Sequence, residues 1–428
     1  MFHSNSHIHF TGIKGVGMTA LALCAQDLGA IVTGSDVDEP FVTDEILAQR
    51  KIHPTIGFAP SHVPLATGLL IYTAAHQGSL NPQVVAAKQK GITAISHAQA
   101  LGELMQDKVG ISVCGVGGKT TTAAMLSHII DRLGAHPSFC IGVGNIPSLH
   151  APGRFDPQGR HFVAEADEYT VDPTQEFAPR FSYQHPKIII CTNIEFDHPD
   201  VYRNLEHTKT VFLEFFNHLP PDGLLIINAD STINQSILPH LKVKYQTYTG
   251  DLNLGNQAAA VAAAVALGFD HDQASAALSD FTGTKRRFEF TGQVGDLWFY
   301  DDYAHHPREI KATLKAAKEK FPHHQLIAIF QPHTYSRTKA LLDEFSRSFT
   351  SADQVIFLPI YASAREKPDP TVSSATLAQL TPQSITVADR VQLVQYLRRQ
   401  IHGSAIIITL GAGDIYQTNL WLKTQFQN

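Results

Sequence analysis

Residues 113–125 read VCGVGGKTTTAAM, and this stretch decides how the rest of the chain is interpreted. The apolar run ISVC at 111–114 predicts a buried strand, and the residues after the glycines predict a helix with an apolar face. Between them lies Gly115-x-x-Gly118-Lys119-Thr120, a short form of the phosphate-binding loop in which Val113 replaces the usual first glycine. The sequence of strand, loop and helix therefore predicts a nucleoside triphosphate site.

The residue types in this loop suit that chemistry. A helix N-terminus presents unpaired N–H groups and the positive end of its dipole to an anion. Gly115 and Gly118 let the backbone approach phosphate oxygens, Lys119 adds a positive charge, and the Thr120 hydroxyl can bind Mg²⁺. Thr121, in the first turn of the same helix, is included among the nucleotide-binding residues. The alternative, an ordinary glycine-rich turn, is disfavoured by the strand before the loop and the helix after it.

Working outward, short apolar runs alternate with helix-length amphipathic segments from end to end. Such runs, for example IIIC at 188–191 and AIIITL at 405–410, are typical of buried strands in mostly parallel sheets. The pattern predicts an α/β protein. Its length and the positions of the loops predict three domains at 1–107, 108–292 and 293–428, with linkers near Asp107 and Gly292.

Composition limits the possible partners. The 428 residues carry a formal charge of -6, which gives no reason to expect nucleic acid or an anionic membrane as a partner. The N-terminus lacks the pattern of a signal peptide, and no apolar run approaches the roughly 20 residues of a membrane span. We therefore expect a cytoplasmic protein. Four cysteines without C-x-x-C spacing are expected to be reduced core thiols.

A second glycine loop lies near the N-terminus. Gly12, Gly15 and Gly17 in GIKGVGM follow one predicted strand and open a helix, and Asp36 ends the next strand. The arrangement is similar to a dinucleotide fingerprint with its ribose-binding acid, but the glycine spacing is permuted. A nucleotide diphosphate fits the same helix terminus. An oxidoreductase therefore remains an alternative.

Two acidic clusters also follow predicted strands. VAEADEY at 163–169 contains three carboxylates, and TNIEFDHPD at 192–200 combines carboxylates with His198. Parallel sheets bind ligands at the carboxyl ends of their strands. Carboxylates with a neutral imidazole suit a divalent cation beside phosphates. The alternative for either cluster alone is a solvated acidic loop.

The C-terminal third supplies further candidates. Arg286 and Arg287 in TKRRFEF can neutralise a transferring phosphoryl group. YDDYAHHPREIK contains Asp302 and two adjacent histidines. Adjacent histidines without other spacing cues are more often polar loop residues than metal ligands, and we interpret these two as loop residues. In FQPHTYSRTK, Arg337 is placed for a two-bond grip on a carboxylate, near His333.

Taken together, these motifs resemble those of the ATP-dependent Mur ligases. The resemblance covers nearly the whole chain, through GIKGVGM, GSD, GKTTT, EADE, TNIEFDHPD, NLGNQAAA, KRRF, DDYAHHPREIKATL, FQPHTYSRT and GAGDI. It implies a UDP-binding Rossmann-like domain, a central P-loop ATPase-like domain and a C-terminal Rossmann-like domain. Within the family, the chain is similar to the members that join L-alanine to the carboxylate of UDP-N-acetylmuramate through an acyl phosphate, in peptidoglycan precursor synthesis.

The resemblance also implies roles for individual residues. The catalytic residues are Lys119, Glu165, His198 and Arg287, and the magnesium ligands are Thr120, Glu165 and His198. Asn253 and Asn256 lie on the adenine side of ATP, and Asp302 is a further nucleotide-binding residue. The UDP-sugar loop is formed by Gly12, Gly15, Gly17 and Asp36, and further substrate contacts come from His306, His333 and Arg337. ATP and Mg²⁺ are the implied cofactors, and a monomer or weak homodimer is expected.

Three departures from the family pattern bear on these roles. Val116 and Gly117 replace a small or hydroxyl residue and a histidine in the phosphate loop. The run between YQTYTG and NLGNQAAA is short, and Leu252 stands where a histidine is usual. The segment between Glu165 and His198 is long, which favours an alternative, the recycling ligase that attaches a tripeptide to the same UDP-sugar. A nucleotide-binding homologue without catalysis is a further alternative.

Overall fold

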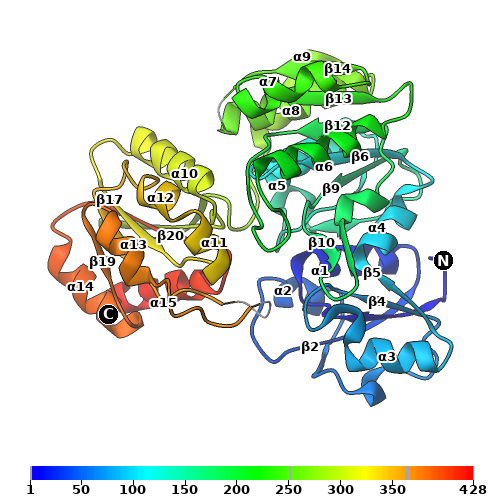
Figure 1. The fold of residues 1–428 in the computed structure, drawn as a ribbon, viewed down its shortest axis with the longest axis horizontal. Helices are drawn as coiled ribbons and strands as arrows, with labels where there is room; N and C mark the ends of the chain where they lie inside the picture. The colour runs from blue at the N-terminus through cyan, green and yellow to red at the C-terminus, as the bar shows by residue number, and fades with distance from the viewer. Residues whose placement is uncertain (1, 251, 363–365, 428) are drawn as a thin grey trace. The chain divides into compact units, whose positions relative to one another are not determined.

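The structure is a computed structural model that describes residues 2–250, 252–362 and 366–427, and at residues 252 and 253 the backbone alone. Its main sheets have five, seven and six strands, each with helices packed beside it (Figure 1). The chain divides into two compact units, of which the first contains Met1–Phe196 and Val201–Lys285, and the second contains Asp197–Asp200 and Arg286–Asn428. The predicted α/β class with mostly parallel sheets is confirmed.

The N-terminal sheet is fully parallel, with the strand order β3-β2-β1-β4-β5 that is typical of a Rossmann-like half. Its strands are β1 (His7–Thr11), β2 (Ile31–Asp36), β3 (Thr55–Ile56), β4 (Leu69–Tyr72) and β5 (Thr93–Ser96). Its helices are α1 (Val16–Asp27), α2 (Asp44–Gln49), α3 (Pro82–Gln89) and α4 (His97–Met105). The predicted glycine loop therefore joins the central strand β1 to α1, at the carboxyl edge of the sheet.

The central sheet has the order β14-β13-β12-β6-β9-β7-β8, with one antiparallel pair, β7 with β8, at its edge. Its strands are β6 (Val109–Cys114), β7 (Ser138–Cys140), β8 (Gly153–Arg154), β9 (His161–Glu165), β12 (Ile188–Cys191), β13 (Leu224–Asn228) and β14 (Tyr245–Tyr248). Its helices are α5 (Lys119–Arg132), α6 (Leu205–Asn217), α7 (Thr232–Ile237), α8 (Leu252–Ala266) and α9 (His271–Ala277). Because β6 lies between β9 and β12, the phosphate-like loop lies between the ends of the two strands that lead into the acidic clusters.

One hydrophobic cluster contains residues of both the N-terminal and the central sheet. Cys140, Phe162 and Ala164 of the central sheet belong to the same cluster of buried residues as α1. At Gly153 a side-chain Cβ would lie 2.1 Å from the Ala20 carbonyl oxygen, so β8 and α1 are in close backbone contact. This common core explains why these two sheets form one compact unit.

The second unit has a six-stranded sheet in the order β15-β16-β20-β17-β18-β19. Its strands are β15 (Glu289–Val294), β16 (Leu297–Asp302), β17 (Gln325–Phe330), β18 (Gln354–Phe357), β19 (Ser384–Thr386) and β20 (Ala405–Leu410). Its helices are α10 (Pro307–Lys320), α11 (Tyr335–Ala340), α12 (Leu342–Ser346), α13 (Ser374–Leu380), α14 (Arg390–Gln400) and α15 (Ile415–Gln427). The sequence placed the start of this sheet at LWFYDD, but β15 pairs antiparallel with β16 and begins eight residues earlier, at Glu289.

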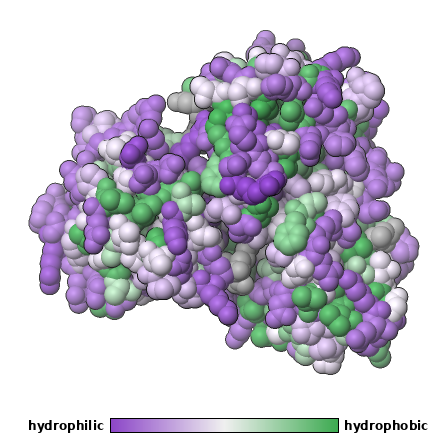
Figure 2. Space-filling view, viewed as in Figure 1, coloured by the Kyte–Doolittle hydropathy of each residue, from purple (hydrophilic) through white to green (hydrophobic). Residues whose placement is uncertain are grey.

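All four cysteines are free and buried, which confirms the expectation of reduced core thiols. Among the described residues, no helix has both the length and the apolar character required to span a bilayer. The face in Figure 2 is largely hydrophilic, and its hydrophobic residues are interspersed with polar ones.

Candidate active site

The loop between β6 and α5 can be built only with glycine at two positions. Gly115 and Gly118 have φ values of 124° and 84°, in the left-handed region that side chains disfavour. A Cβ at Gly115 would lie 2.2 Å from Thr192 Oγ1, and one at Gly118 would lie 2.5 Å from Asn256 Oδ1. The two glycines therefore let the loop pass close to the residues that surround it.

Two residues of the neighbouring strand end hold the loop in place. Thr192 Oγ1 donates to the Gly117 carbonyl oxygen at 2.5 Å, and the Gly117 amide donates to Asn193 Oδ1 at 3.1 Å. Both residues follow β12, which pairs in parallel with β6. The sequence analysis did not identify them as loop residues, although TN at the start of TNIEFDHPD was the available signal. Their two hydrogen bonds fix the position of the Gly117 peptide groups.

Lys119 already contacts an anion of the protein. Its Nζ donates to the Gly115 carbonyl oxygen at 2.6 Å and to Glu168 Oε1 and Oε2 at 3.0 and 2.8 Å. Burial raises the pKa of Glu168 to about 7, and the adjacent ammonium only partly offsets this effect. Burial alone would lower the pKa of Lys119, but the Glu168 carboxylate holds it above its ordinary value. The ammonium is thus kept charged at the mouth of the loop, and a phosphate would compete with Glu168 for it.

Glu165, the last residue of β9, contacts the first turn of α5. Its Oε2 accepts from Thr120 Oγ1 at 3.1 Å, and its Oε1 accepts from the Gly142 amide at 2.7 Å. A hydroxyl and a carboxylate in contact are hard oxygen donors of the kind that Mg²⁺ uses beside phosphates. The proposed metal set of Thr120, Glu165 and His198 fits magnesium in its chemistry. Thr120 and Glu165 lie in the first unit, whereas His198 lies in the short segment assigned to the second.

The predicted adenine-side asparagines lie at the start of α8. Asn256 is buried and accepts from Thr122 Oγ1 at 3.1 Å, which ties α8 to the first turn of α5. The side chain of Asn253 lies outside the described residues. Thr121 is half-buried in the first turn of α5.

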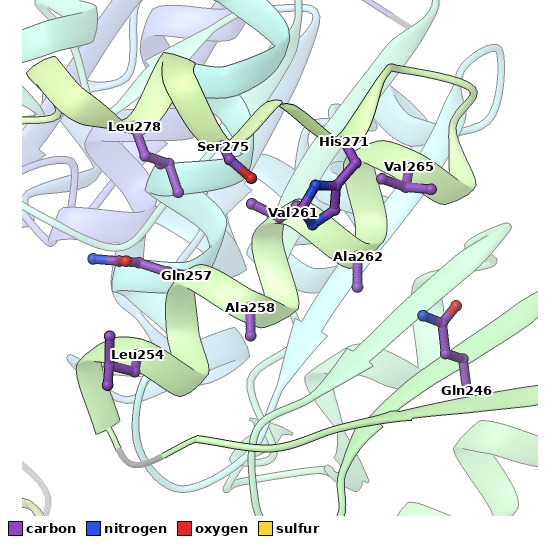
Figure 3. Close-up of a pocket in the computed structure, with 10 residues that line it drawn as sticks. All are labelled: Gln246, Leu254, Gln257, Ala258, Val261, Ala262, Val265, His271, Ser275 and Leu278. Carbon is purple, nitrogen blue, oxygen red and sulfur yellow. The ribbon is translucent and has the colours of Figure 1, made fainter. Parts of the chain in front are cut away.

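A groove of about 420 Å³ lies on the other face of α8 (Figure 3). It is lined by Gln246, Leu254, Gln257, Ala258, Val261, Ala262, Val265, His271, Ser275 and Leu278. Ala259, Ala260, Ala263 and Ala264 of the same helix are buried in the core on the side of Asn256. The helical period therefore separates this groove from the phosphate-like loop.

In the N-terminal sheet, Asp36 organises the first glycine loop. Its Oδ2 accepts from the Lys14 amide at 2.7 Å, and its Oδ1 accepts from the Val37 amide at 2.8 Å. Burial raises the pKa of this carboxyl, and these hydrogen bonds oppose the increase. Gly15 is the N-cap of α1, and Gly17 lies in its first turn against the His97 ring. The structure thus brings together the predicted residues of this loop.

In the second unit, the two adjacent arginines differ. Arg286 is buried, and its Nε donates to Asp301 Oδ2 at 2.9 Å. Arg287 is more exposed, and its Nη1 lies 3.4 Å from Glu309 Oε1 while its guanidinium lies over the Tyr303 ring. The sequence suggested both arginines for charge neutralisation, but the guanidinium of Arg286 is engaged inside the unit.

Asp302 and His306 also have structural partners. Asp302 accepts from the Phe288 and Ala304 amides, each at 2.7 Å, and burial raises its pKa to about 6. His306 is the N-cap of α10, in a capping box with Glu309. Both predicted residues therefore fix the turn between β16 and α10.

Arg337 binds a carboxylate with two hydrogen bonds, as its residue type suggested. The carboxylate is that of Asp197 in the same chain. Arg337 Nε and Nη2 donate to Asp197 Oδ1 and Oδ2 at 2.8 and 3.2 Å. Despite burial, the guanidinium holds the pKa of Asp197 well below its usual range. The His333 ring stacks on Tyr361, with its Nδ1 3.4 Å from Arg337 Nη1. The structure thus brings His333 and Arg337 together.

Comparison with known proteins places the chain in a family. Sequence profiles match in succession: the catalytic domain of the Mur ligase family over residues 7–109, the Mur ligase middle domain over 113–294, and the Mur ligase glutamate ligase domain over 286–413. The UDP-N-acetylmuramate–L-alanine ligase of Desulfitobacterium hafniense is 36% identical over 452 aligned positions, which cover 96% of this chain and 98% of the relative. Because the alignment is longer than this chain of 428 residues, that relative carries residues that this chain lacks.

Solved structures agree on the fold. The UDP-N-acetylmuramate–alanine ligase of Thermotoga maritima matches with a TM-score of 0.78 at 24% identity, over 98% of this chain and 99% of that one. A murein peptide ligase of Psychrobacter arcticus matches with a TM-score of 0.74 at 25% identity, over 99% of both chains. The fold is thus shared by an alanine ligase and a murein peptide ligase, and the fold alone does not choose between these two activities.

Proposed function

The chain belongs to the Mur ligase family, and from this premise we propose that it joins L-alanine to the carboxylate of UDP-N-acetylmuramate at the expense of ATP, in peptidoglycan precursor synthesis. The observation that carries the proposal is the 36% identity to an L-alanine ligase over nearly the full length of both chains. The first glycine loop, with Asp36, is proposed to bind the UDP-sugar, which replaces the oxidoreductase alternative.

The first step is phosphoryl transfer. The lactyl carboxylate of the UDP-sugar attacks the γ-phosphate of ATP, and ADP leaves. Lys119 lies at the N-terminus of α5 in a loop built for close phosphate approach, and is proposed to leave Glu168 for the phosphates. Arg287 is proposed to offset the charge that develops on the transferring group. The residues on the adenine side are proposed to be Asn253 and Asn256, and Asp302 is proposed as a further nucleotide-binding residue.

The second step forms the amide. The amino group of L-alanine attacks the acyl phosphate, and inorganic phosphate leaves. Arg337 is proposed to hold the alanine carboxylate, because its planar fork matches a carboxylate, and to release Asp197, which now occupies that fork, when it does so. His306 and His333 are proposed to contact the substrate nearby. Since three ligands must meet, we expect the C-terminal unit to close over them and exclude water.

Magnesium is the proposed metal cofactor. Bound Mg²⁺ would neutralise charge on the phosphates. Thr120 and Glu165, whose side-chain oxygens lie 3.1 Å apart, would hold it together with His198. We further propose that the protein works in the cytoplasm as a monomer or weak homodimer.

The test is an assay of phosphate release with UDP-N-acetylmuramate, ATP and Mg²⁺ held fixed. We expect turnover with L-alanine and much slower turnover with L-Ala-γ-D-Glu-meso-diaminopimelate. A clear preference for the tripeptide would replace the proposal with the recycling ligase. ATP binding without turnover on either acceptor would favour a homologue without catalysis.

A further inference from the structure

The backbone is strained on both sides of Arg287. Arg286 and Phe288 have φ values of 60° and 50°, in the left-handed region that residues other than glycine rarely adopt. Such conformations persist only where the surrounding contacts fix them, and they cluster at functional sites. The question is which contacts hold this segment.

The side chain of Arg286 supplies one set of contacts. Its Nε donates to Asp301 Oδ2 at 2.9 Å, its Nη2 donates to the Gly411 carbonyl oxygen at 2.6 Å, and its Nη1 donates to that of Gly413 at 3.1 Å. The guanidinium carbon lies 5.1 Å and 4.8 Å from the ring centres of Tyr303 and Tyr416. Each of the three guanidinium nitrogens of Arg286 therefore donates to a different acceptor group.

The backbone supplies a second set. The Arg286 amide donates to Glu289 Oε2 at 2.8 Å, and the Arg286 carbonyl oxygen accepts from the Tyr303 amide at 2.7 Å. The Phe288 amide donates to Asp302 Oδ2 at 2.7 Å. The two aspartates that end β16 therefore hold the residues immediately before and after Arg287, one through a side chain and one through the backbone.

We propose that Arg286 is a positioning residue, which, with Asp301 and Asp302, fixes the segment so that the guanidinium of Arg287 is aimed at the transferring phosphoryl group. This inference rests on the proposed function. It divides the roles of the arginine pair: Arg286 is buried and serves the protein, whereas Arg287, over Tyr303 and beside Glu309, serves the substrate.

A double-mutant cycle tests this division. Lysine keeps the charge but cannot copy three donors in a plane, so Arg286→Lys should lower kcat by about ten-fold or more. The KM for UDP-N-acetylmuramate should stay within about two-fold, because the first glycine loop lies in the other unit. If Arg286 acts through Arg287, adding Arg286→Lys to Arg287→Ala should cost little further activity. Independent, multiplying losses would overturn the proposal.

Amide hydrogen exchange supplies a readout without turnover. In Arg286→Lys, the Phe288 and Tyr303 amides should exchange faster, while those of α14 keep their parental rates. Arg390→Lys is the matched control, since Arg390 lies in the same unit and its Nε donates to Thr418 Oγ1 at 2.9 Å. It should leave both kcat and these amides unchanged.

The outcomes separate the two proposals. Unchanged exchange at Phe288 and Tyr303, or faster exchange with parental kcat, would overturn the role of Arg286 and leave the proposed function standing. A parent protein that releases no phosphate with UDP-N-acetylmuramate and L-alanine would instead overturn the proposed function. Exchange would then still decide whether Arg286 fixes the segment.

Discussion

Lys119 shows how a buried side chain keeps its charge. A buried ammonium without a partner would tend to lose its proton, since burial penalises the charged form. Glu168 prevents this by placing both carboxylate oxygens within hydrogen-bonding distance of Nζ. The loop therefore keeps its positive charge. Under the proposed function, a phosphate would have to displace the carboxylate.

The first prediction belongs to this residue. Lys119→Ala should lower turnover by at least about 100-fold, or ~3 kcal/mol of transition-state stabilisation, since it removes the charge that we propose binds the phosphates. Its circular dichroism spectrum should match that of the parent. Lys209→Ala, which removes a half-buried lysine paired with the exposed Glu206, is the control and should keep parental turnover. Activity of Lys119→Ala within a few-fold of the parent would refute the assignment of the loop.

At the scale of elements, the parallel pairing of β6, β9 and β12 builds the site. Neighbouring parallel strands end at the same edge, so residues that follow each strand meet there. Asn193 is an example, because it follows β12 and yet accepts from the Gly117 amide of the loop after β6. The loop conformation thus depends on a residue 76 positions away in the sequence.

Asn193→Ala should therefore weaken nucleotide binding more than it weakens the fold. It leaves the Gly117 amide without its side-chain partner, which frees a loop whose value lies in its rigidity. We expect the KM for ATP to rise by about five-fold or more, with the KM for L-alanine little changed. Asn217→Ala is a matched control, as Asn217 Oδ1 accepts from an exposed amide, that of Lys242. A rise in both KM values to the same extent would mean that Asn193 supports the fold in general.

The strands and loops were predictable from the sequence because they depend on local pattern. Apolar runs such as ISVC and the glycines after them identify a strand and a tight turn without reference to any partner. The partners themselves were not predictable. Nothing near Lys119 in the sequence indicates that Glu168 binds it, or that Arg286 turns inward while Arg287 does not. These choices depend on which strand ends meet, and that is set by the packing of the whole sheet.

At the scale of the whole molecule, buried histidines predict how the protein responds to acid. Burial lowers the pKa of His9, His97 and His305 from 6.5 to about 4. His9 and His97 lie in the first unit and His305 lies in the second, so both units should lose stability in acid. A histidine with a lowered pKa binds its proton in the unfolded chain first. The native state is therefore favoured above about pH 6.5 and loses stability as the pH falls toward 4.

His9 offers the sharpest test, since it is nearly inaccessible to solvent and its ring nitrogens contact Thr33 Oγ1 at 3.0 Å and Ser35 Oγ at 3.2 Å. With pKa values of 6.5 unfolded and about 4 folded, it alone should cost about 2 kcal/mol of unfolding free energy between pH 7 and pH 5. His9→Gln lowers stability at pH 7 by removing this network, but it should also reduce the loss on going to pH 5 by about the same 2 kcal/mol. Urea unfolding at both pH values measures the difference, with His323→Gln at an exposed position as the control. If His9→Gln and the parent lose equal stability between the two pH values, His9 is already protonated in the native state and its burial does not control the response to acid.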